Sequence, residues 1–343
     1  MEGWLKRGRH RPQRGAARKL AVPSLRQATI GAVVALGAVA TALVVVDHSG
    51  VPTILDPSGC TAEVDGHTVE IDLEQAENAS LITAIAVQRG LPARAASIAL
   101  ATAYQESKLY NIEYGDRDSV GLFQQRPSQG WGSVPELTDP VYATNGFYDA
   151  LAKVEGYQEM EITVAAQEVQ RSGFPDAYAD HEQDARALAS ALTGNSPRAL
   201  WCDVPGDADE APDDLDEQGL VTRAADVRID LEARFGALSL GGFEPAGVTS
   251  GHMEGSAHYE GRAIDVFVRP VSADNRKRGW AMASYLVANA DRLDIKTLIF
   301  DDRIWHAGSR SDDGWTDYRV PSSSGGDRAI LEHRDHVHVD VVD

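Results

Sequence analysis

Residues 256–265 read Ser-Ala-His-Tyr-Glu-Gly-Arg-Ala-Ile-Asp, and residues 336–338 near the C-terminus read His-Val-His. These two stretches decide how the last third of the chain is expected to fold. Residues 336–342 are rich in β-branched side chains and are predicted to form a strand, in which alternate side chains point to the same face. His336 and His338 would share that face, where one imidazole can bind a metal and the other can polarise water. A lone His-x-His is often structural, but its combination with His258 and Asp265 favours a metal site.

The first stretch fits the pattern S-x-H-x-x-G-x-A-x-D at every defined position. It resembles the signature of zinc D-alanyl-D-alanine carboxypeptidases and their hedgehog-type relatives. The resemblance implies that Zn²⁺ is bound by His258, Asp265 and His338, with a fourth coordination position open to water. It also implies that His336 is catalytic without binding the metal. Gly261 would let the chain turn tightly, so that His258 and Asp265 converge on one ion.

Spacing does not dictate the general base or the substrate contacts of this site. The E-x-x-H element of some relatives is missing, which leaves Glu332 and Asp335 as candidate bases. Arg262 is a candidate substrate-binding residue or, alternatively, a member of a surface ion pair. Residues 218–343 as a whole look like a C-terminal domain of actinobacterial envelope proteins, and a metal-free binding module is the alternative. Three further histidines are expected at surface or supporting positions: His252, His306 and His333.

A second candidate site lies in the part of the chain that is expected to be helical. Leu91–Leu109 is dense in alanine, isoleucine and leucine on all sides, which predicts a central, buried helix. Glu106 follows Ala99 by seven residues and Ala103 by three, so it shares their packed face. A carboxyl group removed from water holds its proton to higher pH, as a general acid requires near neutrality.

Glu106-Ser107 followed by Gly121-Leu122-Phe123-Gln124 resembles the E-S and G-L-x-Q elements of lysozyme-like lytic transglycosylases. Residues 104–148 look like the transglycosylase-like domains of actinobacterial cell-wall proteins, and the resemblance covers roughly residues 70–200. It implies that Glu106 acts as acid and then as base on the muramyl-glucosaminyl bond of peptidoglycan. It also implies a set of substrate-binding positions along the glycan groove: Ser107, Gly121, Leu122, Phe123 and Gln124.

The chain departs from this family at one element. Where many members carry A-A-Y-N, it has Ala165-Ala166-Gln167-Glu168. Three nearby residues are candidate substitutes: Gln170, Arg171 and Tyr178. The departure leaves the chemistry open, because an ordinary hydrolase needs a second carboxylate, which Asp116 or Asp118 could supply. A scaffold that binds glycan without cutting it is the other alternative.

The N-terminal region has the charge pattern of a membrane anchor. Residues 1–27 hold eight lysines and arginines against one glutamate, and residues 28–46 form an uncharged run of 19 residues, long enough to cross a bilayer. We expect a transmembrane helix over 28–46, with the basic tail in the cytoplasm by the positive-inside rule. The protein would then be a single-pass membrane protein whose C-terminal body is extracellular and faces the cell wall. A buried helix and a cleaved signal peptide, cut after Ala38-Val39-Ala40, are the alternatives.

Only two cysteines occur, Cys60 and Cys202, and they bracket the region expected to be helical. In an oxidising compartment they are expected to form a disulfide that ties together the two ends of one domain. Two free thiols are the alternative.

The chain of 343 residues is long enough for two folded domains. We expect a multidomain protein in which the transmembrane helix precedes a mainly α lysozyme-like domain at 60–202, an acidic linker at 203–217 and an α+β zinc-peptidase-like domain at 218–343. The net charge of -20 repels phosphate backbones and argues against nucleic acid as a partner.

Both resemblances imply peptidoglycan as the substrate, the first through its glycan strands and the second through its stem peptides. The expected function is that of a membrane-anchored enzyme that remodels the cell wall, with Zn²⁺ as cofactor and with peptidoglycan and the cytoplasmic membrane as partners. A non-catalytic wall-binding scaffold built on two inactivated hydrolase folds is the alternative. A third possibility is a protein that opens the wall locally for a conjugation or secretion apparatus.

Overall fold

The structure is a computed structural model that describes residues 44–46, 52–54, 58–322 and 325–343. The chain divides into two units, Met1–Leu55 and Asp56–Asp343. In the first unit, β1 (Val44–Val46) and β2 (Pro52–Ile54) form an antiparallel pair.

The expected transmembrane helix over 28–46 is wrong in the part that the structure describes. Val44–Val46 form a strand instead of the end of a helix, as three consecutive β-branched residues favour. Residues 28–43 and the basic tail lie outside the described residues. Among the helices that the structure describes, none has both the length and the apolar character that a membrane span needs. The expected single-pass membrane location depended on that helix and is corrected with it.

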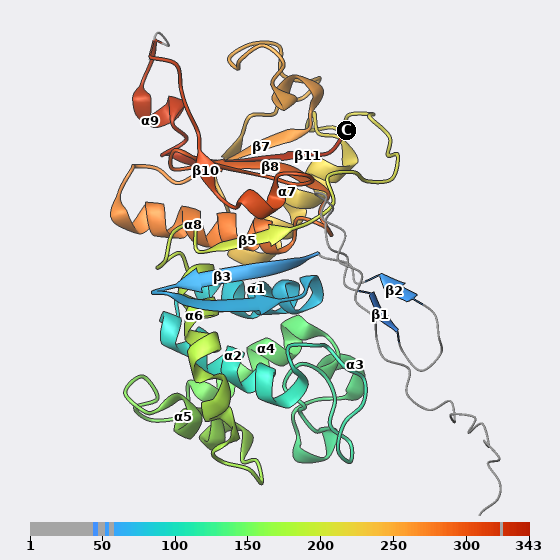
Figure 1. The fold of residues 1–343 in the computed structure, drawn as a ribbon, viewed down its shortest axis with the longest axis vertical. Helices are drawn as coiled ribbons and strands as arrows, with labels where there is room; N and C mark the ends of the chain where they lie inside the picture. The colour runs from blue at the N-terminus through green and yellow to red at the C-terminus, as the bar shows by residue number, and fades with distance from the viewer. Residues whose placement is uncertain (1–43, 47–51, 55–57, 323–324) are drawn as a thin grey trace, which may run out of the picture. The chain divides into compact units, whose positions relative to one another are not determined.

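The N-terminal half of the larger unit is mainly helical and includes a small sheet (Figure 1). β3 (Gly59–Val64), β4 (His67–Ile71) and β5 (Leu200–Asp203) are antiparallel in the order β4-β3-β5. Between β4 and β5 run α1 (Leu73–Gln88), α2 (Ala93–Ser107), η1 (Pro127–Gln129), α3 (Val134–Leu137), α4 (Pro140–Leu151), α5 (Ile162–Gln170), η2 (Ala177–His181) and α6 (Glu182–Leu192), where η marks a 3-10 helix.

The expected buried helix is present as α2. It contacts α1, α4, α5 and α6, and every residue from Ala95 to Ala103 is buried, since small side chains on all sides let several neighbours approach. The helix ends at Ser107, and the next residue, Lys108, adopts the left-handed backbone conformation (φ 58°). The chain therefore turns away directly after Glu106 and Ser107.

The C-terminal half of the larger unit is built on a six-stranded sheet in the order β10-β9-β8-β11-β7-β6, with all neighbours antiparallel. Its strands are β6 (Leu240–Gly241), β7 (Ala263–Phe267), β8 (Ile295–Phe300), β9 (Arg303–His306), β10 (Thr316–Asp317) and β11 (His336–Val341). Its helices are α7 (Thr222–Phe235), η3 (Ala257–Glu260), α8 (Ala273–Ala288), η4 (Ser311–Asp313) and α9 (Arg328–Leu331).

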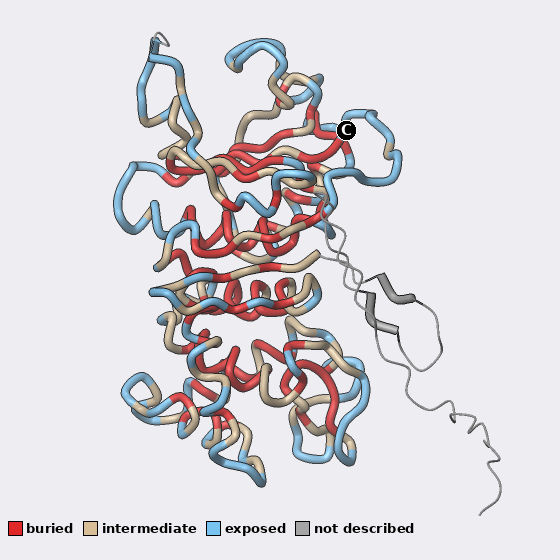
Figure 2. Tube along the Cα trace, viewed as in Figure 1, coloured by how far each residue is buried: buried red, intermediate tan, exposed pale blue. Residues whose placement is uncertain are grey.

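The two halves share one continuous core. α8 packs on β8 and β11 of the large sheet and also contacts α1, α6 and β5, so its residues from Gly279 to Ala288 are all buried (Figure 2). Hydrogen bonds cross between the halves as well. Trp315 Nε1 donates to the Leu200 carbonyl at 2.9 Å, and Asn289 Nδ2 donates to Ser80 Oγ at 2.9 Å. Residues 56–343 therefore form a single compact unit of mixed α and β structure.

The predicted disulfide between Cys60 and Cys202 is confirmed. The two residues lie opposite each other in the paired strands β3 and β5, with their Cα atoms 3.9 Å apart, and both are buried. The bond joins residues 142 positions apart in the sequence. It fixes β5, which also accepts the hydrogen bond from Trp315, to the sheet of the N-terminal half.

Replacing both Cys60 and Cys202 with serine should lower the free energy of unfolding by about 3–5 kcal/mol, because the unfolded chain is then freed from a long covalent loop. Urea unfolding monitored by tryptophan fluorescence measures this, and the same loss is expected for the wild-type chain under reducing conditions. An unchanged urea midpoint in both experiments would show that the bond does not stabilise the fold.

Candidate functional site

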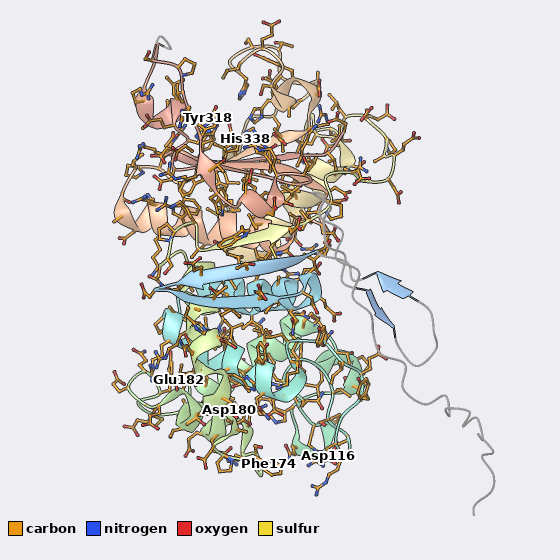
Figure 3. The ribbon with its side chains drawn as sticks, viewed as in Figure 1. Asp116, Phe174, Asp180, Glu182, Tyr318 and His338 are labelled. Atoms are coloured by element: carbon orange, nitrogen blue, oxygen red, sulfur yellow. A yellow bond between two sulfur atoms is a disulfide. The ribbon has the colours of Figure 1, made fainter. Side chains whose placement is uncertain are left out.

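The sheet brings together the histidines and the aspartate that were predicted to bind a metal. β11 pairs with β7 in a register that places His338 directly opposite Asp265. His258 lies in η3, which leads into β7 through Gly261. Gly261 has φ +68°, and a Cβ atom there would lie 2.7 Å from the Gly219 carbonyl oxygen, so this turn requires glycine. Figure 3 shows His338 on this sheet, with Tyr318 near it.

Three ligand atoms converge in this region. His258 Nε2 lies 3.1 Å from His338 Nδ1 and 3.3 Å from Asp265 Oδ1, and His338 Nδ1 lies 3.1 Å from Asp265 Oδ1. All three residues are buried. A tetrahedral ion with bonds of about 2.0–2.2 Å separates its ligand atoms by roughly 3.3–3.6 Å. The triangle formed by His258 Nε2, Asp265 Oδ1 and His338 Nδ1 therefore needs to expand only slightly to hold a metal ion.

The second nitrogen of each histidine in the triangle also has a partner. His258 Nδ1 lies 2.7 Å from the Gly242 carbonyl oxygen, and His338 Nε2 lies 3.4 Å from Asp340 Oδ2. Such outer contacts orient the rings of metal-binding histidines and fix their tautomers. Burial lowers the pKa of His338, but hydrogen bonds and charge from Asp265 and Asp340 outweigh it and raise the pKa to about 9. The triangle is therefore an electron-rich site that attracts a cation.

The backbone of Gly242 packs directly against the His258 ring. Its φ is +79°, and a Cβ atom there would lie 2.3 Å from His258 Cε1. Gly242→Ala should displace the His258 ring and weaken the binding of a divalent metal ion by about 10–100-fold, as loss of an orienting contact typically does. Competition with a chromophoric chelator measures the affinity. Gly236→Ala is the matched control, because Gly236 at the end of α7 has a similar φ of +77° but open space around its Cβ position. Equal metal affinities for the two variants would contradict this role of Gly242.

His336 lies beside the triangle and is held by a carboxylate. Its Nδ1 lies 2.7 Å from Asp335 Oδ1, and its Nε2 lies 3.7 Å from Asp265 Oδ1. Arg269 Nε donates to Asp335 Oδ2 at 2.6 Å, and its guanidinium lies 4.0 Å from the centroid of the Phe267 ring. Burial raises the pKa of Asp335, but the hydrogen bonds from His336 and Arg269 outweigh it and leave the pKa below its usual value. An ionised Asp335 can only accept, so His336 carries its proton on Nδ1 and leaves Nε2 as the basic nitrogen.

The other residues predicted for this site lie as follows. Arg262 forms ion pairs with Glu260 and, at 2.6 Å, with Asp343. Glu332 is occupied by Arg334 at 2.7 Å and Arg328 at 2.6 Å. Arg262 thus forms the ion pairs that were its alternative role, although it also lines the pocket at the triangle. The ion pairs of Glu332 leave it a poor candidate for the general base.

Sequence reasoning placed His252 and His333 at surface or supporting positions, whereas both line the pocket above the triangle. This pocket has a volume of about 690 Å³ and also receives the side chains of Arg269 and Ile330. His252, His258 and Asp265 offer ligand atoms that all lie within 4.8 Å of one another. These three residues could therefore hold a metal ion as well, and His258 and Asp265 belong to both sets. No sequence motif marks His252, since it precedes the signature and lies on a glycine-rich loop.

Glu106, the carboxylate predicted to be catalytic, lies near the end of α2, and its side chain contacts a tyrosine. Tyr178, which is fully buried, donates from its hydroxyl to Glu106 Oε1 at 2.7 Å. Burial raises the pKa of Glu106 above its ordinary value, and hydrogen bonds from Tyr178 and Gln170 offset part of that rise. Gln170 also donates to the Phe123 carbonyl at 2.7 Å. Two of the three candidate substitutes for the missing A-A-Y-N element thus contact Glu106, and the third, Arg171, lines a separate pocket of about 710 Å³ together with Gln170.

The loop that was expected to line the glycan groove is anchored by several of its own residues. Ser107 is buried, and its hydroxyl donates to the Leu122 carbonyl at 2.8 Å. Leu122 and Phe123 are fully buried, so their side chains belong to the core. Gly121 has φ +78°, and a Cβ atom there would lie 2.1 Å from the Leu137 carbonyl oxygen. Gln124 is only partly buried, and its side-chain amide bonds the Tyr114 and Gly121 carbonyls. These residues fix the loop beside Glu106.

Asp116 and Asp118, the candidates for the second carboxylate of a hydrolase, differ in their surroundings. Asp118 accepts from the Ser128 backbone N–H at 2.8 Å and from Arg126 Nε at 2.7 Å, and these hydrogen bonds hold its pKa well below the usual range. Asp116 is exposed and lies 3.8 Å from Arg117. Within the described part of the chain, Glu106 forms no hydrogen bond with either aspartate.

Comparison with known proteins gives one partial match. The sequence model of a protein family described as the C-terminal domain of VldE matches residues 216–328. The matched region runs from before α7 to the start of α9, so it contains His252, His258 and Asp265 and ends before His336 and His338. No curated protein matches the chain.

Proposed function

We propose that the C-terminal half of this chain is a zinc-dependent peptidase that acts on the stem peptides of peptidoglycan. The observation that carries the proposal is the buried triangle of His258 Nε2, Asp265 Oδ1 and His338 Nδ1, with edges of 3.1–3.3 Å. Two imidazoles and one carboxylate are a typical three-residue donor set for catalytic zinc. The substrate class follows from the resemblance of residues 256–265 to D-alanyl-D-alanine carboxypeptidases.

Each residue around the triangle has a separate role in the proposed amide hydrolysis. A zinc ion held there would supply a Lewis acid that polarises the scissile carbonyl and makes water more acidic. His336 Nε2 takes the proton of the attacking water and returns it to the leaving amine. Asp335 orients the His336 ring through Nδ1 and balances the charge that the ring gains. Arg269 is tied to Asp335 through Nε, which leaves its terminal nitrogens to bind a substrate carboxylate.

Digestion of isolated peptidoglycan by the purified chain tests this function. Mass spectrometry of the products should show cleaved stem peptides, a chelator should stop their release, and added zinc should restore it. Stem-peptide products that are unaffected by the chelator would contradict a metal-dependent reaction. Binding to the wall without any products would favour the alternative, a non-catalytic scaffold.

A second function, cleavage of the glycan strand by Glu106, is favoured by the burial of this carboxylate and by its contact with Tyr178. A carboxyl group whose pKa is raised can protonate a glycosidic oxygen near neutral pH. With Asp118 held by Arg126 and Ser128, a single-carboxylate mechanism of the lytic transglycosylase type is the better account. Anhydromuramyl ends among the digestion products would identify it, whereas reducing ends would identify a hydrolase.

Tyr178→Phe should shift the pH dependence of glycan cleavage. The Tyr178 hydroxyl stabilises the ionised form of Glu106, so its removal raises the pKa of Glu106 further. Because the acid form is the active one, the alkaline limb of the pH profile should move to higher pH. Rates measured from pH 4 to 9 test this, with Tyr142→Phe as control, since Tyr142 bonds the Trp131 carbonyl instead. An unmoved alkaline limb in Tyr178→Phe would contradict the role given to Tyr178.

A further inference from the structure

His252 lies on the loop between β6 and η3 and faces the proposed zinc ligands. Its ring centroid is 3.9 Å from that of His258, with the two rings inclined by 31°. One of its nitrogens belongs to the set of ligand atoms from His252, His258 and Asp265 that lie within 4.8 Å of one another. The side chain is partly buried and lines the pocket through which a substrate would reach the triangle.

The backbone of His252 is fixed to the turn that carries His258. The His252 N–H donates to the Tyr259 hydroxyl oxygen at 3.1 Å, and the Tyr259 hydroxyl donates to the His252 carbonyl at 2.6 Å. Tyr259 is the residue after His258, so one short 3-10 turn positions both histidines. The hydrogen bonds described for His252 are both made by its backbone, which leaves the ring nitrogens for a ligand.

The flanking segment permits movement. Gly251 (φ +99°) and Gly255 (φ +79°) have no atom within 4 Å of their Cβ positions, and Met253 between them is 72% exposed. Few packing contacts hold such a segment in one place. The 4.8 Å span of the ligand atoms exceeds the roughly 3.3–3.6 Å of a tetrahedral centre, so a small shift of this loop brings His252 into coordination.

We infer that His252 is a fourth, displaceable ligand of the metal, so that the resting centre is closed by the chain itself. Three protein ligands leave a position for water, whereas four fill a tetrahedral site. Withdrawal of residues 251–255 breaks the two hydrogen bonds between the His252 backbone and Tyr259 and opens the centre to water and substrate. The peptidase is then latent until the loop is displaced. This inference rests on the proposed function, because it presupposes that His258, Asp265 and His338 hold the metal.

Cobalt-substituted protein tests the inference without relying on activity. The full chain and its His252→Ala and Met253→Ala variants are loaded with one equivalent of Co²⁺, and azide is titrated while the visible spectrum is recorded. If His252 occupies the open position in about nine tenths of the molecules or more, it weakens azide binding by about tenfold or more. His252→Ala should therefore bind azide at least about tenfold more tightly than wild type. Met253→Ala alters the same loop without removing a nitrogen ligand and should match wild type.

The outcomes separate this inference from the proposed function. The inference would be overturned if wild type and His252→Ala had equal azide affinities and identical cobalt spectra. His252 would then only stack on His258. A His252→Ala variant that no longer holds cobalt would overturn the displaceable role, since the remaining three ligands would not suffice. A wild-type chain that binds no metal at all would overturn the proposed function itself.

Discussion

Replacing His338 with alanine is expected to remove both the bound zinc and the peptidase activity, with activity falling by at least about 10³-fold. His338 Nδ1 forms two of the three edges of the ligand triangle, so its loss leaves only His258 and Asp265 at the close spacing of a metal centre. His252 belongs to a wider set, whose ligand atoms lie within 4.8 Å of one another, and does not replace the lost contacts. A metal that stabilises the transition state by several kcal/mol changes the rate by three or more powers of ten. Zinc content by mass spectrometry and the rate of stem-peptide cleavage measure the two effects.

His336→Ala is the informative companion to this variant. His336 shares strand β11 and the same face with His338 but lies outside the triangle, where Asp335 holds its Nδ1 at 2.7 Å. This variant should keep about one equivalent of zinc and lose activity by roughly 10²–10⁴-fold, the usual contribution of a general base. Zinc loss in both variants, or full activity in His336→Ala, would contradict the division of roles between the two histidines. Circular dichroism confirms that each variant is folded.

Glu106→Gln is expected to abolish glycan cleavage, lowering its rate by at least about 10²–10⁴-fold, because glutamine cannot donate the proton that the leaving oxygen needs. The fold should persist, since glutamine keeps the size of the side chain and can still accept the hydrogen bond from Tyr178. The release of glycan fragments from peptidoglycan measures the effect. Stem-peptide cleavage by the same preparation should be unchanged.

Asp116→Asn and Asp118→Asn serve as comparisons for Glu106→Gln. The single-carboxylate account predicts that both retain glycan cleavage, because Asp116 is exposed and Asp118 is bound to Arg126 and Ser128. A loss in either variant as large as that in Glu106→Gln would make a two-carboxylate hydrolase the better account.

The parts of the structure that follow from local chemistry were predictable from the sequence. The alternation of His-Val-His predicted that His336 and His338 share a face, and the alanine-rich run predicted a helix buried on all sides. The disulfide followed from the positions of the only two cysteines. The shared face and the buried helix depend on residues close in sequence. The disulfide was predictable because two cysteines allow only one pairing.

Features that depend on long-range packing were not predictable from the sequence. One local feature was also missed, because the hydropathy and charge pattern behind the helix expected over 28–46 does not exclude the pairing of Val44–Val46 with Pro52–Ile54. Leu122 and Phe123 were placed in the glycan groove by motif, but their burial depends on the packing of helices distant in sequence. His252 lines the pocket beside His258, and its backbone is hydrogen-bonded to Tyr259 of η3, a contact without a sequence pattern.

The most direct test of the central claim is X-ray absorption at the zinc edge on the purified full chain loaded with one equivalent of zinc. The account predicts tight stoichiometric binding and nitrogen and oxygen ligands at about 2.0–2.2 Å. At least two ligands should show the scattering pattern of imidazole, from His258 and His338, and their number should fall by one in His338→Ala if any zinc is retained. Zinc bound weakly by oxygen atoms alone, or a spectrum identical in wild type and His258→Ala, would contradict the claim that His258, Asp265 and His338 form a zinc centre.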